Sequence, residues 1–227
     1  MTAEPARGSR AGAACAIAGS ALLFVGTYLH PSGADPNDAL AAFTEYAADR
    51  FWVATHLTQL AGVALMVAAL VALTRELEGG AATAWARITS AGAIASLAIA
   101  AALQAVDGIA LKVMVNAWAA APALQKDGAF HAAFAVRQIE VGLASMVSLS
   151  LGLTAALAGA ALLADGTYPR WLGGLAIAGG IPTTIAGVVM AYTGFSDLTM
   201  AINMPANSLL LVWMALLGVW LRRPRVG

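Results

Sequence analysis

Residues 88–106 read ITSAGAIASLAIAAALQAV, an almost purely apolar run that is followed at once by Asp107. At a rise of 1.5 Å per residue, about 20 such residues form a helix that crosses the roughly 30 Å hydrocarbon core of a bilayer. The whole chain of 227 residues is similar, with 60% hydrophobic and 11% charged residues. Soluble domains have about 45–50% apolar and about 25% charged residues. The run therefore predicts a membrane-spanning helix.

Six runs of this kind occur along the chain, and none shows the alternating pattern of a strand. Only a helix satisfies its own backbone hydrogen bonds inside lipid over such a length. The predicted fold is an all-α membrane protein, a single domain over residues 1–227 formed by a six-transmembrane-helix bundle. The expected spans are 11–29, 52–73, 88–106 (extended to 117), 129–163, 171–192 and 205–221, with a short interfacial helix at 38–46 capped by Asn37 or Asp38.

The loop charges predict the orientation of the bundle. Eight of the twelve basic residues fall before the first span or after the second, fourth and sixth, among them Arg7, Arg75 and Arg170. The positive-inside rule then places both termini in the cytoplasm. Ten arginines against two lysines in an alanine-rich chain suggest a bacterium with a GC-rich genome, so a multi-pass protein of a bacterial plasma membrane is expected. A cleaved signal peptide would leave five spans. The first apolar run exceeds the usual 7–15 residue signal core, which favours a retained helix.

Polar residues gather in the predicted outer half of the bundle, above all in the stretch from Gln104 to Glu140. Ionisable groups in or near a membrane usually face the bundle interior and pair with one another, and they mark functional sites. The sequence predicts that side chains from all six helices or their outer ends approach one another: His30, His56, Gln59, Gln104, Asp107, Lys112, His131, Arg137, Glu140, Asp197, Asn203 and Asn207.

These residues are expected to line an outward-facing polar pocket. The candidate catalytic residues are Glu140 and Asp107 as acid/base or cation-binding carboxylates and His56 as a proton carrier. Arg137 and Lys112 are candidates for holding an anion. The remaining candidate ligand-binding residues are Gln59, Gln104, His131, Asp197 and Asn207. The alternative is a purely structural lattice of ion pairs, in which Arg137 and Glu140 pair across one helical turn.

No cofactor, metal site or nucleic-acid surface is predicted. The three histidines and the carboxylates show no HxxH, HxxxH or CxxC spacing, and such short-range spacing is what usually reveals a metal site in a sequence. There is no glycine-rich phosphate loop and no basic patch. The single cysteine excludes an internal disulfide.

Small residues recur every fourth position in two of the spans. Gly92, Ser96 and Ala100 form one stripe, and Ser148, Gly152, Ala156 and Ala160 form the other. Such stripes let membrane helices approach closely. They allow contact between neighbouring helices, a homo-oligomer or a partner helix.

Three segments carry a resemblance: His56 to Gly62 (HLTQLAG), Val106 to Lys112 (VDGIALK) and Tyr168 to Gly173 (YPRWLG). With the six spans, they resemble an uncharacterised group of small six-helix integral membrane proteins of high-GC, actinobacteria-like bacteria. The resemblance covers most of the chain and implies no established activity.

Three functions remain open at this point. The first is binding of a small amphiphilic or lipophilic molecule in the polar pocket, whose walls are Leu, Ile, Val and Ala, with catalysis left open. The second is a structural or accessory subunit that packs against a partner. The third is a proton-linked small-molecule transporter, suggested by Pro182 within the fifth span and by the intramembrane ionisable groups.

Overall fold

Six long helices form the body of the protein in a computed structural model that describes residues 7–222. They are α1 (Arg7–Leu29), α3 (Trp52–Thr74), α4 (Gly80–Gln104), α6 (Lys126–Asp165), α7 (Arg170–Thr193) and α8 (Asp197–Leu221). Within the described chain, six helical segments are long and apolar enough to cross a membrane, and no strand is present. The predicted six-helix, all-α fold is therefore confirmed.

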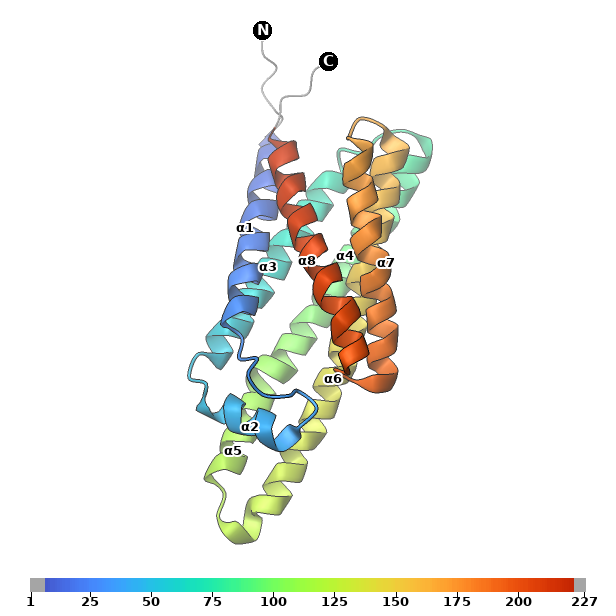
Figure 1. The fold of residues 1–227 in the computed structure, drawn as a ribbon. Helices are drawn as coiled ribbons and strands as arrows, with labels where there is room; N and C mark the ends of the chain where they lie inside the picture. The colour runs from blue at the N-terminus through green and yellow to red at the C-terminus, as the bar shows by residue number, and fades with distance from the viewer. Residues whose placement is uncertain (1–6, 223–227) are drawn as a thin grey trace.

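The six helices close into a ring in the order α1, α3, α4, α6, α7, α8, with α8 returning to α1. The start of α1 and the end of α8 lie at the same end of the bundle, as six crossings require (Figure 1). The interior is filled mainly by alanine and leucine, with Trp213 and Met214 of α8 fully covered. The ring thus has a packed centre rather than a pore.

Glycine determines how closely the helices approach. Gly152 of α6 faces Gly180 of α7, where a Cβ added to Gly152 would lie 2.5 Å from Thr184 N and 2.6 Å from Gly180 O. On the other side of α6, Thr154 packs against Gly92 and Ser96 of α4. Gly92, Ser96 and Gly152 of the two predicted stripes therefore lie in contacts between neighbouring helices of the same chain.

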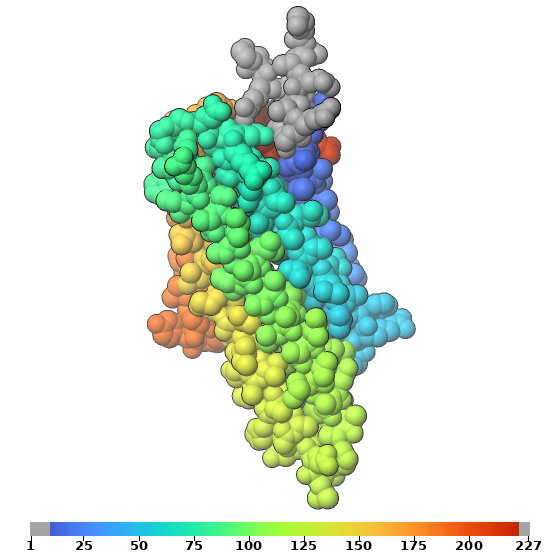
Figure 2. Space-filling model, turned by 180° about the vertical axis from the view of Figure 1, so that it is seen from behind, coloured from blue at the N-terminus to red at the C-terminus, as the bar shows by residue number. Residues whose placement is uncertain are grey.

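The pair α4 and α6 continues far beyond the length that a membrane requires. The residues after α4 form a π-helical segment, η1 (Ala105–Leu111), and then α5 (Lys112–Ala120). The joined segment of 41 residues is about 60 Å long at the α-helical rise, twice the thickness of a bilayer core. A short 3-10 turn, η2 (Ala123–Gln125), leads into α6. The hairpin of α5 and the first part of α6 extends past the other helices (Figures 1 and 2).

A short helix, α2 (Ala39–Ala48), lies across the base of this hairpin. Asp38 is its N-cap and accepts from Leu40 N and Ala41 N, both at 3.1 Å, which confirms the predicted cap. Its Phe43 packs on Trp118 of α5 and Phe130 of α6, with ring centroids 6.0 and 5.5 Å apart. These aromatic contacts hold α2 against the hairpin.

Two helices begin about two turns earlier than the sequence pattern suggests. α4 begins at Gly80 rather than at 88, because Gly79 at φ 94° and Gly80 at φ 36° adopt a turn that only glycine tolerates well. The last helix begins at Asp197 rather than Pro205, with Ser196 as its N-cap. Pro205 lies inside α8, although a proline usually stands in the first turn or interrupts a helix.

Candidate functional site

Polar side chains bridge the start of α3 and the junction between α4 and η1. On α3, Trp52, His56 and Gln59 are spaced by four and three residues, so they lie on one helical face. His56 Nε2 lies 3.0 Å from Asp107 Oδ2, and Gln104 Nε2 donates to Gln59 Oε1 at 3.3 Å. The structure therefore brings together four of the sequence-predicted site residues at the seam between these two helices.

His56 is held by hydrogen-bond acceptors on both sides of its ring. Its side chain is 1% exposed, and Nδ1 lies 2.7 Å from the Trp52 carbonyl while Nε2 faces the Asp107 carboxylate. A carbonyl can only accept, so Nδ1 carries a proton. In the neutral imidazole Nε2 therefore has no proton and can only accept. Two acceptors cannot bond to each other, so a proton or another cation is needed between Nε2 and the carboxylate.

Asp107 lies within the π-helical segment. Short π segments inside α-helices occur frequently at functional sites. Here the segment turns the carboxylate towards α3, and Trp52 Nε1 donates to the Asp107 carbonyl at 2.9 Å. Gly108 makes the approach possible, since a Cβ at this position would lie 2.6 Å from His56 Cβ.

Two acceptor oxygens at this seam have no partner among the described residues. Asp107 Oδ1 and Gln104 Oε1 are both buried and make no hydrogen bond. A buried polar atom without a partner costs about 1–3 kcal/mol, and more if it is charged. Each such atom calls for an explanation, and a bound ligand, an ion or an ordered water is one that satisfies it.

His30, which follows the last residue of α1, lies beside this seam. Its ring is 5.1 Å from those of both Trp52 and His56 between centroids, and its Nδ1 lies 2.8 Å from the Pro31 carbonyl. Burial lowers the pKa of His30, and His56 lowers it further, while Asp107 raises it. The sequence pattern predicts that His30 lies in the outer half and assigns it no role. The only signal was its position at the end of the first span.

A second charged pair lies on α6. Arg137 Nη1 donates to Glu140 Oε2 at 2.5 Å, and the two side chains are 8% and 3% exposed. The guanidinium also donates to the Pro36 carbonyl at 3.3 Å and lies over the rings of Tyr46 and Phe195. This pair therefore ties α6 to α2 and to the loop before it.

Tyr46 of α2 lies between the two polar groups. Burial raises the pKa of Tyr46 to about 12, with Arg137 lowering it and both Glu140 and Asp107 raising it. All three charged groups therefore act on the same phenol. The His56–Asp107 pair and the Arg137–Glu140 pair belong to one electrostatic environment.

The other predicted site residues lie apart from this environment or have structural contacts. Lys112 donates from Nζ to the carbonyls of Tyr46, Ala47 and Asp49, so it neutralises the negative C-terminal end of α2. His131 pairs with Asp127 at 3.6 Å on the hairpin, with side chains 70% and 92% exposed. Asp197 and Asn207 are exposed on α8, where Asn207 Nδ2 donates to Asn203 Oδ1 at 3.0 Å.

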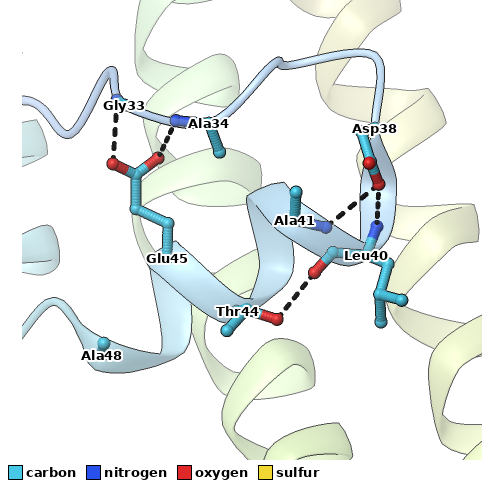
Figure 3. A pocket seen from close by; sticks show the side chains of 8 residues that line it. All are labelled: Gly33, Ala34, Asp38, Leu40, Ala41, Thr44, Glu45 and Ala48. Carbon is cyan, nitrogen blue, oxygen red and sulfur yellow. Dashed lines mark hydrogen bonds between the residues drawn. The ribbon is translucent and has the colours of Figure 1, made fainter.

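An open hollow of about 640 Å³ lies beside α2 rather than at the α3–α4 seam. It is lined by the loop before α2 and by one face of that helix (Figure 3). Glu45 lies in it with both carboxylate oxygens accepting from backbone, Gly33 N at 2.9 Å and Ala34 N at 3.1 Å. The candidate site residues do not line this hollow. The polar groups of the hollow hydrogen-bond to neighbouring residues, and the Glu45 contacts hold the loop against α2.

No protein-family model, curated protein or solved structure matches this chain.

Proposed function

We propose that this polytopic membrane protein binds a small amphiphilic or lipophilic molecule at the outer end of the α3–α4 seam. The carrying observation is the pair of buried, unpartnered acceptors, Asp107 Oδ1 and Gln104 Oε1. Hydrogen-bond donors satisfy such acceptors, so a head group that bears a hydroxyl or an amine fits them. Val53 and Leu57 of α3, each next in sequence to a seam residue, and Ile109 of η1, two residues after Asp107, are exposed apolar side chains. An alkyl chain lies naturally along such a surface.

The residues divide into two roles in this proposal. Asp107 and Gln104 bind the head group, and His56 exchanges a proton with Asp107 across their 3.0 Å contact. Arg137, Glu140 and Lys112 hold α2 and the hairpin in place around the site. We further propose that the bundle lies in a bacterial plasma membrane with both termini in the cytoplasm, as the arginine distribution of the loops favours.

The accessory-subunit alternative has less support. Gly92, Ser96 and Gly152 of the small-residue stripes already contact neighbouring helices of the same chain. A partner helix or a second copy would therefore need a different surface. The transporter alternative needs a polar path through the inner half, and the described core consists mainly of alanine and leucine.

Binding of 1-dodecanol tests the proposal, with methyl dodecyl ether as the matched molecule that lacks a donor. The full chain in lipid nanodiscs, treated with EDTA, is dialysed to equilibrium against each labelled molecule, with empty nanodiscs as background. We expect saturable binding of the alcohol and none of the ether. Asp107→Asn removes the charge and keeps a side-chain donor for His56 Nε2. It should weaken alcohol binding about fivefold or more, because hydrogen bonds to charged groups contribute about 1 kcal/mol more than neutral ones.

Asp127→Asn is the control, since Asp127 is an exposed carboxylate that also faces a histidine. It should bind the alcohol as the wild type does. Equal binding of alcohol and ether, or an Asp107→Asn variant that binds like the wild type, would refute the proposed site.

A further inference from the structure

Two histidines and a carboxylate from three separate elements meet at the outer end of the bundle. One donor atom from each of His30, His56 and Asp107 lies within 4.8 Å of the other two. His30 follows α1, His56 lies in the first turns of α3, and Asp107 lies in η1. Because their sequence separations are 26 and 51, no short motif could reveal this cluster.

Both imidazoles are held in the way that metal-binding histidines are held. Histidines that bind a metal usually donate the N–H of the other ring nitrogen to a carbonyl or carboxylate, which fixes the tautomer and the ring orientation. Here Nδ1 of His56 faces the Trp52 carbonyl at 2.7 Å, and Nδ1 of His30 faces the Pro31 carbonyl at 2.8 Å. In both rings the nitrogen left to bind a cation is Nε2.

Asp107 supplies the negative charge that such a cation requires. Its Oδ2 lies 3.0 Å from His56 Nε2, and its Oδ1 is buried with no partner among the described residues. A cation between the imidazoles and the carboxylate binds the Nε2 lone pair of each histidine and gives the carboxylate a second interaction. No lysine or arginine among the described side chains forms an ion pair with Asp107.

We propose that His30, His56 and Asp107 form a binding site for a divalent transition-metal ion of the zinc class. Two imidazoles and one carboxylate match the ligands that Zn²⁺ prefers, whereas Ca²⁺ and Mg²⁺ are bound by oxygen atoms. Ligand atoms around tetrahedral Zn²⁺ lie about 3.3 Å apart, given bonds of about 2.0–2.2 Å. The present limit of 4.8 Å therefore requires His30 to move inwards. This is feasible because His30 lies beyond the last turn of α1, and it is only half-buried.

The inference concerns the same site as the proposed function and rests on it for the fourth ligand. Three protein ligands leave one coordination position open, as in catalytic zinc sites. The hydroxyl oxygen of the proposed head group fits this position. The metal site itself requires only the three side chains.

Cobalt titration tests the metal site without any assumption about activity. The full chain in detergent micelles is stripped with EDTA, dialysed and titrated with Co²⁺, while the visible d–d absorption is recorded. We expect one Co²⁺ per chain, with absorption that Zn²⁺ abolishes by displacement. His30→Gln and Asp107→Asn should each weaken Co²⁺ binding at least tenfold, with the near-UV circular dichroism unchanged.

His131→Gln is the matched control, because His131 also lies beside a carboxylate but is exposed on the hairpin. It should bind Co²⁺ as the wild type does. Absence of stoichiometric Co²⁺ binding, or a His30→Gln variant with wild-type affinity, would overturn the metal site. The dodecanol measurement is made in EDTA, so loss of the metal result leaves the alcohol result standing, and the reverse holds equally.

Discussion

Glu140→Ala is expected to destabilise the protein by about 3–5 kcal/mol, because it leaves the guanidinium of Arg137 buried without its carboxylate. The two side chains are 8% and 3% exposed, and the remaining contacts of Arg137 are one carbonyl and two aromatic rings. These contacts do not neutralise the charge. Arg137→Ala should have a similar effect, since it strands the carboxylate.

The measurement is the free energy of unfolding in mixed micelles titrated with dodecyl sulfate. Arg137→Met/Glu140→Leu serves as the comparison, because replacing both partners of a buried pair with apolar residues is often neutral. The double variant should recover most of the free energy of unfolding that Glu140→Ala loses. Asp127→Ala removes one partner of the exposed pair with His131 and should change stability by less than about 1 kcal/mol. A loss of that small size for Glu140→Ala would show that the α6 pair is solvated in the membrane.

Gly152→Ala is the second change with a large expected effect. The added methyl would lie 2.5 Å from Thr184 N and 2.6 Å from Gly180 O, both of them backbone atoms of α7 that cannot rotate away. The two helices must separate along their contact. Overpacking of this kind costs about 1–3 kcal/mol, sometimes more.

Gly142→Ala provides the control within the same helix. No atom outside the local backbone lies within 4 Å of a Cβ at Gly142, so this change should be neutral or stabilising by up to about 1 kcal/mol through helix propensity. Thermal unfolding of the two variants in the same detergent distinguishes them. If Gly152→Ala is as stable as Gly142→Ala, α6 and α7 do not meet at these glycines.

The fold could be predicted from the sequence because a bilayer requires long apolar helices with internal hydrogen bonds. Six apolar runs joined by polar connections predict a bundle of six spanning helices, and the described chain has six helices of the required length and composition. The helix boundaries were less predictable where special chemistry acts. Gly79 and Gly80 end the loop before α4 early through their positive φ angles, and Ser196 caps the start of α8 well before Pro205.

The candidate site was only partly predictable from residue types. Periodicity places His56 and Gln59 on one face of α3, but it does not show which neighbour faces them. The π segment is the reason: it changes the direction of Asp107 relative to a regular α-helix, and no local residue pattern signals it. Lys112 was expected to hold an anion, and its amine instead binds three carbonyls at the end of α2. Its partner helix lies 63 to 66 residues away in sequence, beyond the reach of pattern analysis.

The polar residues around α2, η1 and the hairpin separate into a structural part and a candidate binding part. Arg137, Glu140 and Lys112 have partners within the chain that hold α2 and the hairpin together. Asp107 and Gln104 keep acceptors that no described residue satisfies. A structural lattice of polar contacts accounts for Arg137, Glu140 and Lys112. It does not supply a partner for the free acceptor oxygens of Asp107 and Gln104.

A cryo-electron microscopy map of the protein in lipid nanodiscs tests the central claim most directly, with a fiducial antibody fragment to allow alignment of so small a chain. The central claim is that Asp107 presents a buried carboxylate oxygen to a ligand at the α3–α4 seam. The account predicts density that no protein atom explains within bonding distance of Asp107 Oδ1, which is lost in Asp107→Asn. A map in which this oxygen is bonded to a side chain of the protein, with His30 and His56 turned away and no further density, would contradict it.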